Sequence, residues 1–164
     1  MHNPMAAEII HGLNSYFTFR LGEELFAINI GQMIKILEMP EITRVPNSPH
    51  FFKGIINLLG DVIPIFDGRL KFGFPEKLAT RDTCILILVF EHDGQPVCSG
   101  IIVDSVEKVL VFETDEIKPA PAVGKGFNAE FISGIATYKG EFVIILNLEK
   151  IFSEEEIKLI TTVD

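Results

Sequence analysis

The sequence predicts a mostly β protein with two small five-stranded barrels side by side and a short C-terminal helix. Three observations support this. Apolar and polar residues alternate with period two through most of the chain, one β-unit occurs twice, and the last segment has apolar residues at helical spacing. With 48% hydrophobic residues among 164, the chain can bury a core and lacks the composition of a disordered protein.

The first half of the chain is predicted to contain five strands. They are 15–21, 25–30, 33–39 and two within GIINLLGDVIPIFDGRL at 54–70. A loop with two prolines at 42–49 separates the third strand from the fourth, and Gly60 is expected in the turn of the last hairpin. The polar segment 70–82 is predicted to cross over to the second half.

The second half is predicted to repeat this plan. A hairpin around Asp93-Gly94 is followed by a strand near VEKVLVF (106–112) and a Pro/Gly-rich loop at 118–128. A last hairpin is expected within 131–147. Ser153 precedes three glutamates, an arrangement typical of a helix N-cap with acidic residues in the first turn, so a short helix is expected within 148–160.

The repeat is the main clue to organisation. Gly54-Ile55 recurs as Gly134-Ile135 and Gly60-Asp61 as Gly140-Glu141, both at an offset of 80 (134 − 54 and 140 − 60). Upstream, MIKIL resembles VEKVL, and ITRVP resembles IKPAP. The alternative is chance similarity between two apolar hairpins. Two such units would close into barrels that leave no exposed sheet edge, with a cleft between them as a natural binding site.

Charge and targeting signals narrow the class of partner. A net charge of −9 argues against nucleic acid or an anionic membrane, because both require basic patches. No apolar run approaches the roughly 20 residues of a membrane helix. We read no secretory signal in the N-terminal segment. Cys84 and Cys98 are expected to be buried, reduced thiols of a cytosolic protein.

Motifs for catalysis or metal binding are lacking. The four histidines (His2, His11, His50 and His92) form no recognisable zinc motif, the two cysteines are too far apart for a redox pair, and GKGF at 124–127 is not a phosphate loop. The remaining enzymatic alternatives are Cys84 with His50 or a pair among Asp61, Asp67 and Asp104. We therefore predict a binding module without catalytic residues, metal or cofactor.

The string GIINLLGDVIPIFDGRLKFG resembles the signature of the CheW family of chemotaxis coupling proteins, which is close to G-x-x-N-L-R-G-x-x-x-P-x-x-D-L-R. The segments ITRVPNSPHFFKG, GIIVDSVEKVL and LNLEKIF also fit, so the resemblance extends from about residue 16 to residue 160. It implies a single domain at 14–160 after an N-terminal tail at 1–13. The lobes would be two five-stranded SH3-like barrels around a shared apolar core, at about 30–80 and 82–135 with swapped-in terminal strands.

The resemblance also implies an adaptor without catalysis or cofactor. Such an adaptor links the signalling tip of chemoreceptors to the regulatory domain of a histidine kinase, in the cytoplasm and recruited to membrane receptor arrays. An adaptor of another chemosensory-type kinase pathway, for surface motility or gene regulation, is the alternative.

Contact residues follow from the same resemblance. Receptor contacts are expected in the groove between barrels, at Met33, Ile36, Asn57, Leu58, Leu59, Val103, Ser105 and Val106. Kinase contacts are expected at Leu37, Met39, Thr43 and Val45. Each has an alternative role in the core, since alternate residues of any strand point inward. Gly54 and Gly134 are expected to permit a bulge or a close backbone approach.

Three positions depart from the family pattern. Leu59 replaces the usual arginine, Gly68 the usual leucine, and Lys35 a frequent glutamate. We hypothesise that the first and third changes are linked, with the stem of Lys35 packing on Leu59 in place of an ion pair.

Overall fold

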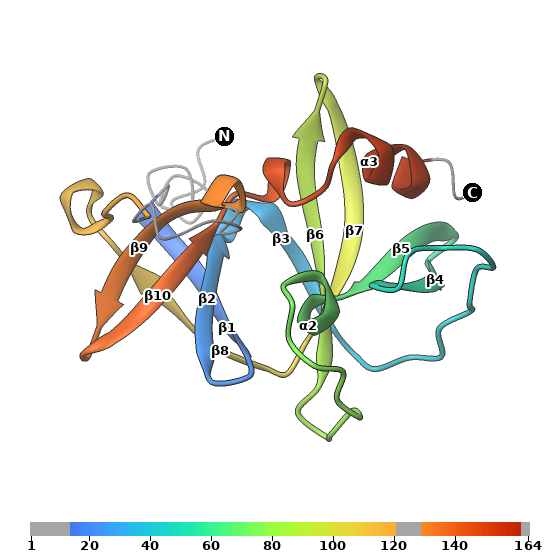
Figure 1. Cartoon of the computed structure of the whole chain (residues 1–164), viewed down its shortest axis with the longest axis horizontal. Coiled ribbons are helices and arrows are strands. Elements are labelled where there is room, and N and C mark those ends of the chain that lie inside the picture. Colours follow the sequence, from blue (N-terminus) through green and yellow to red (C-terminus); the bar gives the residue numbers. More distant parts are fainter. Residues whose placement is uncertain (1–13, 121–128, 162–164) are drawn as a thin grey trace, which may run out of the picture.

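β-Strands dominate the computed structural model, which describes residues 14–120 and 129–161. The predicted tail at 1–13 and most of the loop at 118–128 lie outside these residues. The strands form two five-stranded sheets that lie side by side (Figure 1). We call them sheet A, with order β8-β1-β2-β10-β9, and sheet B, with order β3-β6-β7-β5-β4.

Sheet A contains β1 (Ser15–Leu21), β2 (Glu24–Asn29), β8 (Ser105–Val111), β9 (Ile132–Tyr138) and β10 (Glu141–Leu146). Sheet B contains β3 (Met33–Glu38), β4 (Phe52–Leu58), β5 (Asp61–Asp67), β6 (Cys84–His92) and β7 (Gln95–Val103). Short 3-10 turns join some of them: η2 (Ile30–Gln32), η3 (Thr114–Glu116), η4 (Ala129–Phe131) and η5 (Leu148–Lys150). The predicted fold class, mostly β with two five-stranded units and a C-terminal helix, is confirmed.

The predicted lobe boundaries need a correction. Hairpin β6–β7, which we assigned to a second lobe at 82–135, belongs to sheet B. This hairpin is joined to the rest of sheet B by a parallel pairing of β5 with β7, in which Ile65 lies opposite Gly100. A Cβ on Gly100 would lie 2.4 Å from Ile65 Cδ1, so a residue without a side chain is needed there. Sheet A has the matching joint between β10 and β2, with Val143 opposite Leu25. Each sheet therefore combines strands from both repeats.

Isolated bridges close both sheets at equivalent positions. Thr43, after β3, pairs with Ile55 of β4, and Lys118, after β8, pairs with Ile135 of β9. Ile55 and Ile135 are related by the offset of 80, and Thr43 and Lys118 occupy matching places in ITRVP and IKPAP. The sequence repeat thus has a counterpart in the structure.

The largest core cluster draws residues from both sheets and from the C-terminal segment. Phe26 of sheet A stacks on Phe72, with ring centroids 5.6 Å apart, and Phe66 of sheet B meets Phe152 edge-on at 4.6 Å. Phe72 and Phe152 are also related by the offset of 80. Each follows the last strand of its repeat and packs between the sheets.

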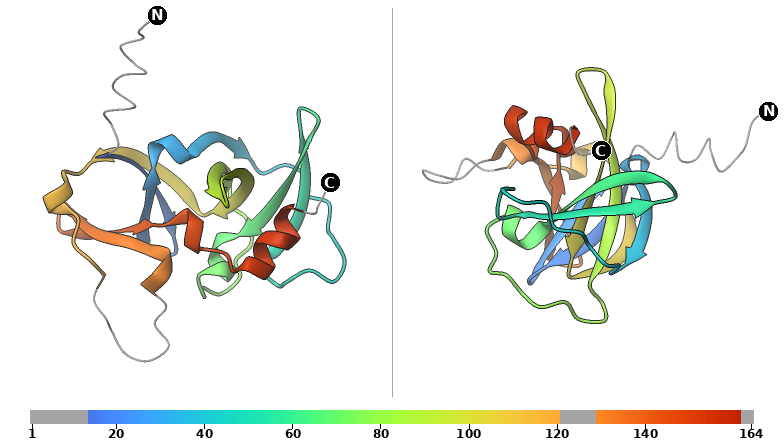
Figure 2. Two further views of the ribbon diagram at one scale, coloured as in Figure 1. Left: turned by 90° about the horizontal axis from the view of Figure 1, so that it is seen from above. Right: turned by 90° about the vertical axis from the view of Figure 1, so that its right-hand side faces the viewer.

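Two helices flank this core. The short α2 (Gly68–Lys71) lies between the sheets, and α3 (Glu154–Thr161) lies over sheet B (Figures 1 and 2). Helix α3 begins where the sequence predicts it. Glu156 N–H donates to Ser153 Oγ (3.1 Å), and Ser153 N–H donates back to Glu156 Oε1 (2.8 Å). Ile157 and Ile160 are buried against the core.

The carboxylate of Asp104 stabilises the junction at which the chain passes from sheet B to sheet A. Asp104 lies between β7 and β8, and its Oδ2 accepts hydrogen bonds from Arg69 Nη1 (2.5 Å) and Gly22 N–H (2.7 Å). Arg69 belongs to α2 and Gly22 to the β1–β2 turn. Asp104 therefore ties three segments together at the junction of the sheets.

Candidate protein-interaction surfaces

The tip of hairpin β4–β5 presents an unusual leucine. Leu59 and Gly60 form a two-residue turn between Leu58 and Asp61, and both have positive φ, 52° and 93°. A leucine in this region is strained by about 1 kcal/mol. Its side chain is also 92% exposed. Neither backbone geometry nor burial within the chain accounts for a leucine here.

A second exposed apolar group lies on β3. Met33 and Leu37 pack against two different core clusters, whereas Ile34 and Ile36 are 55% and 41% exposed. Met39, after the strand, is 37% exposed. A strand with apolar residues on both faces is typical of one covered on both sides. We use the name β3 surface for the exposed apolar residues of sheet B, which are Ile34, Ile36 and Met39 on and after β3, and Leu59 at the tip of hairpin β4–β5.

The equivalent strand of sheet A shows the same pattern. Val106 and Leu110 of β8 pack against two different core clusters, while Val109 and Val111 are 48% and 63% exposed. Phe142 of β10, 68% exposed, lies beside an open hollow of about 760 Å³. The hollow is lined by Glu24, Asp115, Glu116, Lys118, Pro119, Ile135, Thr137, Phe142 and Ile144. We use the name β8 surface for the exposed apolar residues of sheet A, which are Val109 and Val111 of β8, and Phe142 of β10, a strand separated from β8 by β1 and β2 in the sheet order.

The residues predicted to contact the receptor fall into separate places. Val103 is fully buried, and it shares one core cluster with Met33 and Val106, which pack at its edge. Without movement of the core, Val103 contacts no partner, so its assignment to an open groove was wrong. Ser105 is half-buried at the start of β8.

The other members of that set lie nearer the surface. Leu58 is half-buried against the core of sheet B. Asn57 is exposed, and its Oδ1 accepts a hydrogen bond from Gly60 N–H (3.1 Å), which supports the turn. Leu59 and Ile36 are exposed apolar residues and remain candidates for contact.

The residues predicted to contact the kinase lie along the end of β3 and the segment after it. Leu37 is half-buried and Met39 is exposed. Thr43 is exposed and closes sheet B through its backbone, and the carbonyl of half-buried Val45 accepts a hydrogen bond from Ser48 Oγ (2.9 Å). Sequence reasoning missed Ile34. The available signal was that alternation leaves apolar residues on both sides of the strand.

Close approach of the backbone explains both bridge glycines. A Cβ on Gly54, whose φ is 143°, would lie 2.0 Å from the carbonyl oxygen of Thr43. A Cβ on Gly134 would lie 2.4 Å from Ile117 Cγ2. The same reason applies to Gly68, one of the departures from the family pattern, because its Cβ would lie 2.7 Å from the carbonyl oxygen of Ile102.

The hypothesis of a contact between Lys35 and Leu59 was wrong. Lys35 is exposed on β3, and Leu59, at 92% exposure, has no neighbour that covers it. A lysine stem packed on Leu59 would have buried much of that side chain. The leucine is thus not a compensated change within the chain.

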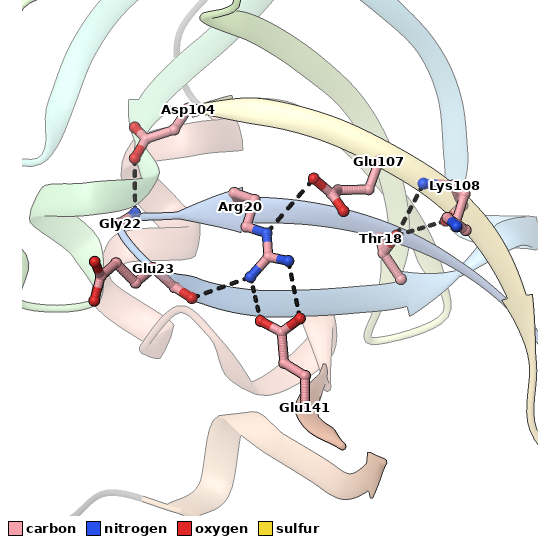
Figure 3. A network of polar contacts seen from close by, with 8 residues as sticks. All are labelled: Thr18, Arg20, Gly22, Glu23, Asp104, Glu107, Lys108 and Glu141. Atoms are coloured by element: carbon pink, nitrogen blue, oxygen red, sulfur yellow. Dashed lines mark hydrogen bonds and ion pairs between the residues drawn. The ribbon is translucent and has the colours of Figure 1, made fainter. Parts of the chain in front are cut away.

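A polar network joins strands of sheet A (Figure 3). The guanidinium of Arg20 in β1 forms a bidentate pair with Glu141 of β10, and its Nε lies 3.5 Å from Glu107 of β8. The hydrogen bond with Glu141 raises the pKa of Arg20 and lowers that of Glu141. Thr18 Oγ1 also donates to the carbonyl of Lys108 (2.6 Å). These contacts join β1 to its neighbour β8 and to β10, which lies beyond β2 in the sheet.

The residues proposed for catalysis do not converge. Asp67 caps α2 by accepting from Arg69 N–H and Leu70 N–H, Asp104 pairs with Arg69, and Asp61 is exposed at the hairpin. Burial raises the pKa of the Cys84 thiol, whose side chain lies in the core, while His50 is exposed. None of the described helices is long and apolar enough to cross a membrane.

Two linked sheets with exposed apolar strand faces define a protein-binding scaffold. Comparison with known proteins agrees. The model of the CheW-like domain matches residues 15–156, so the chain belongs to the CheW family, whose members are non-catalytic scaffolds of chemotaxis signalling.

Individual relatives support this assignment. The chain is 34% identical to chemotaxis protein CheW of Klebsiella aerogenes over 90% of its length and 87% of the relative. It is 29% identical to chemotaxis protein CheW of Treponema pallidum, over 86% of this chain and 83% of the relative. Its fold matches the crystal structure of scaffolding protein TtCheW from Thermoanaerobacter tengcongensis with a TM-score of 0.76 and 33% identity, covering 85% of this chain and 92% of that one.

Proposed function

We propose that this protein couples chemoreceptors to a histidine kinase by binding both at once. The single observation that carries the proposal is the presence of two exposed apolar surfaces on equivalent edge strands of different sheets. A coupling protein requires two such surfaces, because one partner must leave the other's site accessible. Membership of a family of chemotaxis scaffolds supplies the context.

In this proposal the kinase's regulatory domain binds the β3 surface, which transfers Leu59 and Ile36 from the predicted receptor contacts to the kinase contacts. Leu59 is the exposed apolar residue at the tip of hairpin β4–β5, where both turn residues have positive φ. An exposed, strained leucine gains stability only when a partner buries it, by about 2 kcal/mol for full burial. Ile34 and Ile36 extend the contact along β3.

The signalling tip of the receptor is assigned to the β8 side. Such tips are helical, and a helix buries an apolar face in a groove through residues spaced by three and four. Val109 and Val111 offer branched side chains along the strand, with Ser105 at its start. In this proposal the protein is cytoplasmic and joins the membrane array through the receptor.

Reconstitution with the cognate kinase and receptor fragment tests the proposal. Kinase autophosphorylation should change when the protein is added to both partners, and not when it is added to the kinase alone. Leu59→Ser should lower affinity for the kinase domain at least tenfold and leave receptor binding unchanged. Val109→Lys should lower affinity for the receptor fragment at least tenfold and leave kinase binding unchanged.

Leu78 provides a matched control. It is 91% exposed, almost the same as Leu59, but lies in the segment between α2 and β6, outside both surfaces. Leu78→Ser should bind both partners like the parent protein. Equal losses for Leu59→Ser and Leu78→Ser, or autophosphorylation unaffected by the complete mixture, would contradict the proposal.

A further inference from the structure

Three side chains able to bind a metal ion meet where helix α3 begins. His92 ends β6, Asp93 follows it in the hairpin turn, and Glu154 is the first residue of α3. His92 Nε2 lies 3.4 Å from Asp93 Oδ2 and 3.2 Å from Glu154 Oε2. The three ligand atoms all lie within 4.8 Å of one another.

The two distances from His92 Nε2 match the spacing of ligand atoms on one ion. Ligand atoms bonded to zinc at about 2.0–2.2 Å in tetrahedral geometry lie about 3.3 Å apart. Hydrogen bonding alone satisfies the group poorly, because the Nε2 of a neutral imidazole carries at most one proton and faces two carboxylates. A cation placed between them would contact all three atoms.

We propose that His92, Asp93 and Glu154 bind a divalent transition-metal ion. Imidazole together with carboxylate suits zinc, nickel or copper, whereas magnesium and calcium take oxygen ligands alone. Three protein ligands leave a fourth position for water. Asp93 and Glu154 are mostly exposed, so the site is accessible to ions in solution.

The ion would join α3 to hairpin β6–β7. Helix α3 is otherwise held by Ile157 and Ile160 in the core and by Lys71, whose Nζ donates to Glu156 Oε1 (3.0 Å). An ion that binds only the docked helix stabilises the docked state. Sequence motifs do not reveal this site because Glu154 follows His92 by 62 residues, outside any zinc-motif spacing.

Zinc titration of the untagged protein tests the site. The parent should carry His2→Gln and His11→Gln, so that the N-terminal histidines contribute nothing. Isothermal titration with zinc chloride should then give one ion per chain. His92→Gln and Glu154→Gln should each lower the affinity by at least about tenfold. His50→Gln and Glu155→Gln are the matched controls and should bind zinc like the parent.

Hydrogen exchange provides a second measurement. Zinc should slow exchange of the α3 amides in the parent and leave them unchanged in His92→Gln. Absence of zinc binding, or equal binding by His92→Gln and the parent, would overturn the site. Zinc binding without protection of α3 would overturn its role in holding the helix. Neither result depends on the proposed coupling function.

Discussion

Leu59 and Lys139 occupy the same position in two hairpins that are 80 residues apart in the chain. Each is the first residue of a two-residue turn whose second residue is glycine. Both have a positive φ, 52° for Leu59 and 50° for Lys139. The left-handed turn is therefore a property of the repeat, and the residue placed in it is free to differ. Leucine, which gains nothing there within the chain, is best explained by a partner.

We expect Leu59→Asn to raise the free energy of unfolding by about 1 kcal/mol, because asparagine tolerates the left-handed region better than leucine. Urea denaturation measures this gain. The same substitution should weaken kinase binding, so stability and affinity should move in opposite directions. Lys139→Asn should leave the free energy of unfolding unchanged or raise it, and should not weaken kinase binding. A destabilised Leu59→Asn protein would mean that Leu59 packs within the chain after all.

Gly54→Ala should be more damaging than Gly134→Ala. The new Cβ would meet the backbone of Thr43 at 2.0 Å in the first case, and a side-chain methyl, Ile117 Cγ2, at 2.4 Å in the second. Only Gly54 also has a positive φ, 143°. We expect losses of about 3 and about 1 kcal/mol in the free energy of unfolding. Equal losses in thermal and urea unfolding would contradict this account of the two bridges.

Replacement of Asp104 should separate its two roles. Asp104→Asn keeps an acceptor for Gly22 N–H but leaves Arg69 without its carboxylate, and we expect a loss of about 2 kcal/mol. Asp104→Ala also removes the acceptor, so its loss should be larger. Asp82→Asn, in the exposed segment before β6, should leave stability unchanged in the same urea measurements. If Asp104→Asn behaved like Asp82→Asn, the ionic contact would have no structural role.

Acid should weaken the attachment of α3. Burial raises the pKa of Glu156, but hydrogen bonds from Ser153 and Lys71 outweigh it, and the pKa lies below the ordinary 4.5. Its contribution to stability is therefore present above about pH 4.5 and is lost as the pH falls through the lower pKa of the folded state. Glu156→Gln should flatten this part of the stability profile, measured by urea unfolding between pH 6 and pH 3. Glu155→Gln should keep the parent's profile in that range.

Local patterns predicted the strands, but not the partners that they take across the chain. Alternation and turn residues located the hairpins, and the repeat of Gly54-Ile55 as Gly134-Ile135 located equivalent bridges. Hairpin β6–β7 was assigned to the wrong lobe because its parallel contact at Gly100 joins distant segments. Side-chain alternation carries no information about which distant strand will pair.

Only part of the candidate surfaces could be predicted, because local patterns do not show how distant strands pack. Leu59 was recognised as unusual because it stands where the family signature has arginine, and a single position can be compared with such a signature. The exposure of Ile34 and the burial of Val103 depend on which face of a strand the rest of the fold covers. Period two divides residues between two faces and cannot say which face meets solvent.

The exchange of strands between repeats also affects how the chain emerges from the ribosome. Leu25 is synthesised early, but its parallel partner Val143 follows 118 residues later (143 − 25). At 5–20 residues per second, the hairpin β1–β2 waits on the order of 10 s with an unpaired edge. Sheet B, complete once β7 has been made, can form in the meantime. The nascent protein is thus exposed to mispairing for most of its synthesis, and the edge closes only when β10 arrives.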